Sequence, residues 1–162
     1  PSQRQGALCI YKVPVAGAPP VRVRCENAAV ALGVPDSSTL YYATQFRGGN
    51  GGWDYEIFKA QPENGKAEKL GHVSGGRVPF DPIVFQLILS PDGKLLAGPL
   101  LDGTTCNLWA LPTEGGPMRR LTDFGERSIL IARSIAWAVD SGHIYAAVQE
   151  TDADIVSLVG LL

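Results

Sequence analysis

Short apolar runs alternate with turns rich in Pro, Asp, Gly and Ser along almost the whole chain. Three of these turns lead directly into an apolar strand, at residues 34–43, 90–97 and 139–146. In such turns Pro presets φ, Asp accepts from the amide two residues on, and Gly adopts positive φ. Five residues are therefore expected to be structural turn residues of a repeated unit: Asp36, Asp92, Gly93, Asp140 and Gly142.

A polar loop and a second apolar strand follow each of these strands. The second strands are expected at 55–60, 107–111 and 154–158, with a fourth copy at 8–13. One apolar residue in each copy serves as a reference: Ile10, Ile57, Leu108 and Ile155. The references are 47, 51 and 47 residues apart. This period matches the roughly 40–50 residues of a β-propeller blade.

Two further strands complete each period. One precedes each turn, at 28–32, 83–89 and 133–137, and its continuous apolar character is typical of a strand covered on both faces. The other is short and basic and ends each unit, at 21–23, 69–70 and 118–122. Four strands per period without a helical stretch predict an all-β chain of four-stranded antiparallel blades.

The strand pattern predicts a partial β-propeller: about three four-stranded blades with an incomplete blade at each end. The expected parts are a linker or cut terminus at 1–6, a blade part at 7–26, blades at 27–79 and 80–128, and the last blade at 129–162. Propellers close with roughly four to eight blades. We therefore expect the C-terminal part of a longer propeller, or a fragment that associates with another copy through its open edges.

Composition and charge exclude several classes. Hydrophobic residues make up 45% and charged residues 19% of the chain, which excludes disorder from a lack of apolar material. The formal net charge of −2 gives no basic face for nucleic acid. No apolar run approaches the roughly 20 residues of a membrane span. Two basic pairs are expected at solvated strand edges: Arg22 with Arg24, and Arg119 with Arg120.

The three cysteines show no metal-binding or redox spacing. Cys9 and Cys25 can face each other across neighbouring strands, but an odd count without a framework favours free, buried thiols, Cys106 included. Free thiols favour a cytoplasmic location.

A glycine-rich run at 48–52 raises the possibility of a phosphate loop. A phosphate loop leads into a helix, whereas this run leads into a strand, so a hairpin connection is favoured. Trp53 follows the run and has no repeat counterpart, so it is the best candidate for a ligand or partner contact, together with Arg47 and Asn50. Two other tryptophans fall at repeat-equivalent positions and are expected to pack between blades: Trp109 and Trp137.

Reactive groups do not gather into a recognisable catalytic or metal motif. His72 and His143 lack the companions of a zinc site or hydrolase triad, and no G-x-S-x-G segment is present. Three carboxylates in one loop, Glu150, Asp152 and Asp154, have a spacing that can hold a hard cation, but solvated loop charge is favoured. We predict no catalytic, cofactor-binding or metal-binding residue.

One unit carries a family resemblance. Residues 90–97 (SPDGKLLA), 107–109 (NLW), 115–116 (GG) and 121–122 (LT) resemble the TolB-like, WD40-like (PD40) β-propeller repeat. Residues 83–122 match closely, and the flanking units match in diverged form from Leu8 onward. The tail is similar to the last blade of propellers in bacterial multidomain regulators, although 138–142 (AVDSG) replaces SPDGK there.

The resemblance implies a non-enzymatic interaction or sensory scaffold in a bacterial regulatory protein, such as a serine/threonine kinase or winged-helix regulator. Its partner would be a protein, a peptide, a small ligand or the missing blades of the same propeller. One alternative is the propeller of a prolyl oligopeptidase-type serine peptidase, which gates a separate hydrolase domain. Another is a TolB-like periplasmic component of an envelope complex, so the resemblance also allows an extracytoplasmic location.

Overall fold

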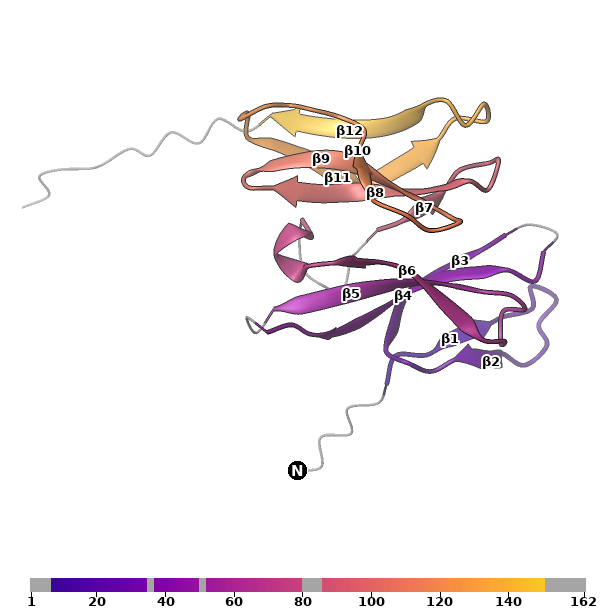
Figure 1. Cartoon of the computed structure of the whole chain (residues 1–162). Helices are drawn as coiled ribbons and strands as arrows, with labels where there is room; N and C mark the ends of the chain where they lie inside the picture. The colour runs from indigo at the N-terminus through magenta and orange to yellow at the C-terminus, as the bar shows by residue number, and fades with distance from the viewer. Residues whose placement is uncertain (1–6, 35–36, 50–51, 80–85, 151–162) are drawn as a thin grey trace, which may run out of the picture.

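The computed structural model describes residues 7–34, 37–49, 52–79 and 86–150. In these ranges the chain forms twelve β-strands, one 3₁₀ turn and no α-helix. The strands form four antiparallel sheets, drawn in Figure 1. The expected all-β, antiparallel architecture is confirmed.

We number the sheets in chain order. Sheet 1 contains β1 (Ile10–Lys12) and β2 (Val21–Arg24). Sheet 2 contains β3 (Ala28–Gly33), β4 (Leu40–Arg47), β5 (Trp53–Ala60) and β6 (Ala67–Val73), and the 3₁₀ turn η1 (Gly75–Arg77) comes after it. Sheet 3 contains β7 (Ile88–Leu89), β8 (Leu95–Asp102), β9 (Thr105–Pro112) and β10 (Arg119–Arg120). Sheet 4 contains β11 (Ile129–Trp137) and β12 (Ile144–Glu150).

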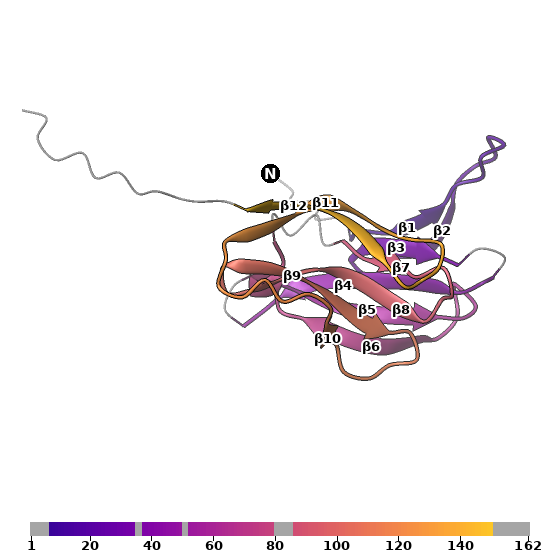
Figure 2. The same ribbon diagram turned by 90° about the horizontal axis from the view of Figure 1, so that it is seen from above.

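Sheets 2 and 3 are meanders in which each strand pairs with its neighbours in sequence. The β4–β5 ladder is continuous from Leu40↔Ala60 to Arg47↔Trp53. Figure 2 shows the first strands β3, β7 and β11 on one side of the molecule and the last strands β6 and β10 on the other. The further strand expected at 154–158 lies outside the described residues.

Period-two alternation sends successive side chains of β4 to opposite faces of sheet 2. Tyr41 and Ala43 belong to a core shared with Leu96, Leu100 and Leu111 of sheet 3. Leu40 and Tyr42 belong to a second core, against which the half-buried Ile10 and Val23 of sheet 1 pack. A sheet that is apolar on both faces must be covered on both, and sheet 2 is covered by the sheets before and after it in sequence.

A third core joins sheet 3 to sheet 4. Cys106 and Leu108 of β9 are buried against Ile129, Ile131 and Ile135 of β11. Burying one such side chain contributes about 1.5–3 kcal/mol relative to leaving it exposed. The four sheets therefore pack onto one another in sequence order, with a separate apolar core at each of the three junctions.

Ion pairs recur at equivalent places between the sheets. Lys12 of β1 reaches Glu63 after β5 at 3.0 Å, and Lys59 of β5 reaches Glu114 after β9 at 2.9 Å. Surface ion pairs of this kind contribute at most about 1 kcal/mol to stability. They are informative because they show how consecutive sheets are placed relative to each other. They place β1 and β5 at the same position relative to the next sheet in sequence, so β1 corresponds to the third strand of sheet 2.

Sheet 1 contradicts two expectations from the sequence. Cys9 and Cys25 form a disulfide because the β1–β2 hairpin brings the residue before β1 opposite the residue after β2. Only Cys106 is the expected free, buried thiol. Arg24 is not a solvated edge residue, since its guanidinium lies over the Tyr42 ring and donates to the carbonyls of Glu63 and Gly65. Three other arginines of the two basic pairs are exposed as expected: Arg22, Arg119 and Arg120.

Candidate functional site

A hollow of about 550 Å³ opens where the first strands of three sheets converge. It is lined by residues 31–34 in and after β3, by Ile88 and Leu89 of β7, and by residues 135–137 of β11. The turn after β7 adds Ser90, Pro91 and Gly93. The lining is thus largely apolar and comes from segments about 50 residues apart in sequence.

The strands around this hollow also offer backbone groups. In the described part of the chain, β3, β7 and β11 each lie at the end of a sheet and pair on one side only. Such an edge presents N–H and C=O groups to an incoming chain. The indole of Trp137 donates to the carbonyl of Ile88 at 3.4 Å, which joins β11 to β7 and confirms the expected packing of this tryptophan between sheets.

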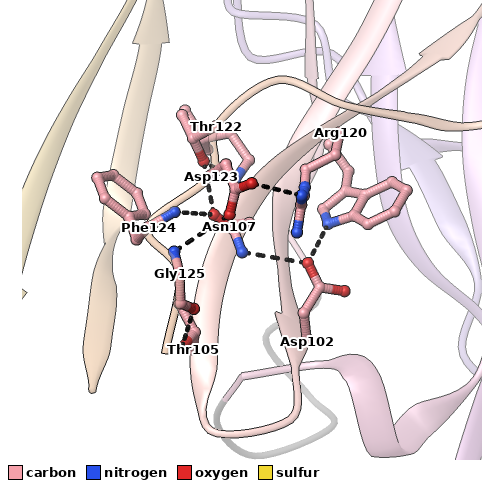
Figure 3. Close-up of polar contacts among 10 residues, drawn as sticks. Asp102, Thr105, Asn107, Arg120, Thr122, Asp123, Phe124 and Gly125 are labelled. Carbon is pink, nitrogen blue, oxygen red and sulfur yellow. Dashed lines mark hydrogen bonds and ion pairs between the residues drawn. The ribbon is translucent and has the colours of Figure 1, made fainter. Parts of the chain in front are cut away.

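A polar cluster around the buried Asn107 holds sheet 3 together. We call Asp102, Asn107, Trp109 and Thr122 the Asn107 cluster (Figure 3). Asn107 is 1% exposed and donates to Asp102 at 3.2 Å. Its carbonyl accepts from the Thr122 hydroxyl at 3.0 Å and from the Phe124 amide at 3.2 Å. Thr122 in turn accepts from the Leu108 amide at 2.9 Å. The Asn and Thr of the NLW and LT motifs therefore fasten the segment after β10 to β9.

Arg77 connects sheet 2 to this cluster. Its guanidinium stacks on the Trp109 ring at 4.3 Å, donates to Asp102 at 2.7 Å and donates to the Leu101 carbonyl at 3.2 Å. The Trp109 indole donates to the other Asp102 oxygen at 3.1 Å. Trp109 therefore packs between sheets as expected. The role of Arg77 was missed, since nothing in the sequence around η1 indicates which strand its side chain meets.

The turn before β8 has the expected chemistry. The Ser90 hydroxyl donates to Asp92 at 2.7 Å, and Asp92 accepts from the Lys94 amide at 3.2 Å. These two hydrogen bonds hold the pKa of the exposed Asp92 carboxyl below its ordinary value of 3.8. Gly93 has φ +73°, as predicted for this position.

The turn before β12 differs in one respect. Asp140 accepts from the Gly142 amide at 2.9 Å and from His143 at 2.8 Å, and these bonds lower the pKa of Asp140. The positive φ of this turn belongs to Ser141, at 56°, and not to Gly142. The expected turn residue Asp36 lies outside the described residues.

Two of the three residues expected to contact a partner lie side by side. Trp53 is half-buried against the core between sheets 2 and 3, and the Arg47 guanidinium lies 4.2 Å from its ring centre. Asn50 lies outside the described residues. Trp53 is half-buried and Arg47 is exposed, so both stay predicted contact residues.

Histidines and carboxylates are dispersed among local partners. His72 is 3.3 Å from Asp54, and His143 belongs to its own turn, as expected. Glu150 pairs with Arg127 at 3.7 Å, while two of the three loop carboxylates lie outside the described residues, Asp152 and Asp154. Within the described ranges no three His, Cys, Asp or Glu side chains lie close enough together to hold a metal ion.

The described part of the chain contains no helix long and apolar enough to cross a membrane.

Comparisons with known proteins add neither a family nor a function. The sequence matches no protein-family model and no curated protein.

Proposed function

We propose that this chain is a non-enzymatic, β-propeller-type interaction scaffold that binds an extended apolar peptide segment of a partner protein. The supporting observation is the apolar hollow of about 550 Å³ at the converging strands β3, β7 and β11. Propeller blades place their first strands around a channel, and the convergence of β3, β7 and β11 on one hollow supports a propeller-type arrangement. A bacterial regulatory protein with this scaffold remains the context implied by the repeat resemblance.

The chemistry of the hollow selects the ligand class. Side chains such as Leu89 and Val34 provide apolar contact, while the one-sided strands provide main-chain donors and acceptors. An extended peptide satisfies both, because its backbone pairs with a strand edge and alternate side chains enter the apolar lining. A charged or sugar-like ligand would leave its polar groups facing this lining.

Phage-displayed random peptides, selected on the full chain, test the proposal. We expect enrichment of apolar peptides that shift the backbone amide resonances of Ile88 and Ala31. Ala31 is exposed and lines the hollow, so Ala31→Arg should place a long charged side chain across it and abolish binding. Asn64→Arg, in the exposed β5–β6 turn, is the matched control and should bind like the parent. Failure to enrich any peptide, or equal binding by both variants, overturns the proposal.

The Cys9–Cys25 disulfide favours a second candidate, a TolB-like scaffold outside the cytoplasm. Disulfides persist in oxidising compartments and are rare where thiols are kept reduced. The pairing therefore removes the argument for a cytoplasmic location. Rapid alkylation of thiols in intact cells of the source organism, followed by peptide mass mapping, tests this location. We expect Cys9 and Cys25 to resist labelling; modification of both excludes the candidate.

A further inference from the structure

We propose that the outer edge of β12, with which no strand of the described residues pairs, pairs with β1 of a second copy of this chain, so that sheet 4 of one copy and sheet 1 of the other form one four-stranded sheet. The proposal rests on the same packing of consecutive sheets as the proposed function. It concerns a different surface, the outer strands of the two end sheets.

The two end sheets are complementary halves. Each turn before a second strand is closed by a hydrogen bond from an amide to the carbonyl five residues later: Val34 to Thr39, Ser90 to Leu95 and Ala138 to His143. This contact gives β12 the same place in its sheet as β4 and β8, the second strand. The ion pair of Lys12 gives β1 the place of the third strand. In the described residues, sheet 4 thus has a first and second strand, and sheet 1 has a third and fourth.

The complete sheets predict the register of the new pairing. In sheet 2, Ala43 lies opposite Ile57, and in sheet 3, Pro99 lies opposite Leu108. Ala43 and Pro99 both lie four residues beyond the carbonyl that closes the turn, and the same offset in sheet 4 gives Ala147. Ile57 and Leu108 are the repeat equivalents of Ile10. Ala147 should therefore lie opposite Ile10 of the second copy.

This register recreates a cross-strand pair that sheet 2 already contains. Two residues before Ala147 is Tyr145, which would lie opposite Lys12 of the second copy. In sheet 2 the corresponding pair is Tyr41 and Lys59. Tyr41 is 4% exposed, whereas Tyr145 is 69% exposed in the single chain. Pairing would bring Tyr145 to the face from which Lys12 reaches Glu63, where its ring can pack on sheet 2 of the second copy.

Exposed apolar side chains are concentrated on the same two half-sheets. Of the nine large apolar residues exposed in the described ranges, only Phe46 lies on a complete sheet. The other eight lie in or beside sheet 1 or sheet 4: Leu8, Tyr11, Val13, Val15, Val21, Val139, Tyr145 and Val148. Patches of this kind mark interaction surfaces. The predicted register places Val13 opposite Ile144 and Cys9 opposite Val148.

A closed ring of sheets requires two copies of the chain. Each copy contributes sheets 2 and 3 and shares one further sheet, so one copy supplies three sheets to a ring and two copies supply six. Closed propellers have roughly four to eight sheets. Two copies fall within this range, whereas one and three do not. The site is incomplete in a single copy, because the hollow is then bordered by sheets on one side only.

A disulfide cross-link tests the register. Directly opposed residues have Cβ atoms about 4.5–5.5 Å apart, close enough for a disulfide after small adjustments. The double variant Tyr145→Cys/Lys12→Cys of the full chain should give covalent dimers on mild oxidation, with the linked peptides identified by mass spectrometry. The control Tyr145→Cys/Tyr11→Cys moves one partner to the adjacent position on the opposite face and should not cross-link. Equal cross-linking of both, or of neither, refutes the register.

Light scattering of the unmodified chain tests association. We expect a dimer, and Tyr145→Lys should convert it to a monomer because Lys12 of the second copy lies opposite. Thr104→Lys, in the exposed β8–β9 turn of a complete sheet, should leave the dimer intact. A monomeric parent chain whose β12 amides are protected from hydrogen exchange overturns the proposal. In that case another segment of the same chain covers the edge of β12, and the strand expected at 154–158 is the candidate. A monomer that still binds peptide in the hollow refutes the dimer alone, and a dimer that binds none refutes the proposed function alone.

Discussion

The amide of Asp92 donates to the Ser141 hydroxyl at 3.0 Å, so the turn that begins β8 touches the turn that begins β12. The two residues are 49 positions apart, about one repeat, and occupy adjacent positions in equivalent turns. Turn chemistry that shapes each hairpin locally thus also aligns sheet 3 with sheet 4.

Substitution at Ser141 should weaken this alignment. Ser141→Ala removes the acceptor while keeping a side chain at φ 56°, and we expect a loss of about 1 kcal/mol in the free energy of unfolding. Ser141→Gly removes the same acceptor but relieves the positive φ, so its loss should be smaller. Urea denaturation measures both. An Ala variant as stable as the parent would show that the hydrogen bond contributes nothing.

Acid should weaken the turn before β8. The pKa of Asp92 is lowered by hydrogen bonds that the unfolded chain lacks. A lowered folded-state pKa means that the contribution to stability is complete above the unfolded pKa of 3.8 and is lost as pH falls through the folded pKa. We expect Ser90→Ala to move the pKa of Asp92 upward, as measured by NMR titration of its carboxyl carbon. An unchanged titration curve would contradict the assigned cause.

A substitution at Thr122 tests how much the Asn107 cluster contributes to stability. Thr122→Val keeps the shape of the side chain but removes the hydroxyl, which leaves the Leu108 amide and one lone pair of Asn107 without their partner. We expect the free energy of unfolding to fall by about 1–3 kcal/mol. Thr104→Val, the same change at an exposed loop position, should have little effect. Thermal unfolding followed by circular dichroism compares the two variants.

The three cysteines should react in a fixed pattern. Burial raises the pKa of the Cys106 thiol and shields it, so alkylation should modify Cys106 only after denaturation. Cys9 and Cys25 should become reactive only after reduction. Their separation of 16 residues corresponds to about 3 kcal/mol in the chain-entropy account of a disulfide. Reduction should therefore increase hydrogen exchange in sheet 1 first, and rapid labelling of the native thiols would contradict this pattern.

Local chemistry made the elements predictable. The turn residues Asp92 and Gly93 act as their types indicate, and the strands that come after the turns are present where the apolar runs predict them. Repeat equivalence also predicted that Trp109 and Trp137 pack between sheets. These features depend on residues within a few positions of each other, or on a period that the sequence displays directly.

Contacts between sheets could not be predicted from the local sequence. The position of Arg77 over Trp109 and that of Arg24 over Tyr42 depend on how consecutive sheets stack, which single residues do not indicate. The disulfide was missed because the odd number of cysteines was given more weight than the facing of Cys9 and Cys25 across neighbouring strands. One signal was available: Lys12 and Lys59 are 47 residues apart, and Glu63 and Glu114 are 51 apart, the same two spacings as the strand references.

The recurring lysine–glutamate contact means that two junctions, between sheets 1 and 2 and between sheets 2 and 3, are built from equivalent parts. A chain of this design can change length by whole units, because a duplicated segment brings both halves of a familiar interface with it. Inserting a second copy of residues 61–111 would supply four more strands, and the copied Glu63 would follow β9 at the place where Glu114 now meets Lys59. A deletion of part of a unit leaves sheets whose surfaces do not match. This architecture should therefore tolerate a gain or loss of about fifty residues better than a change of any other length.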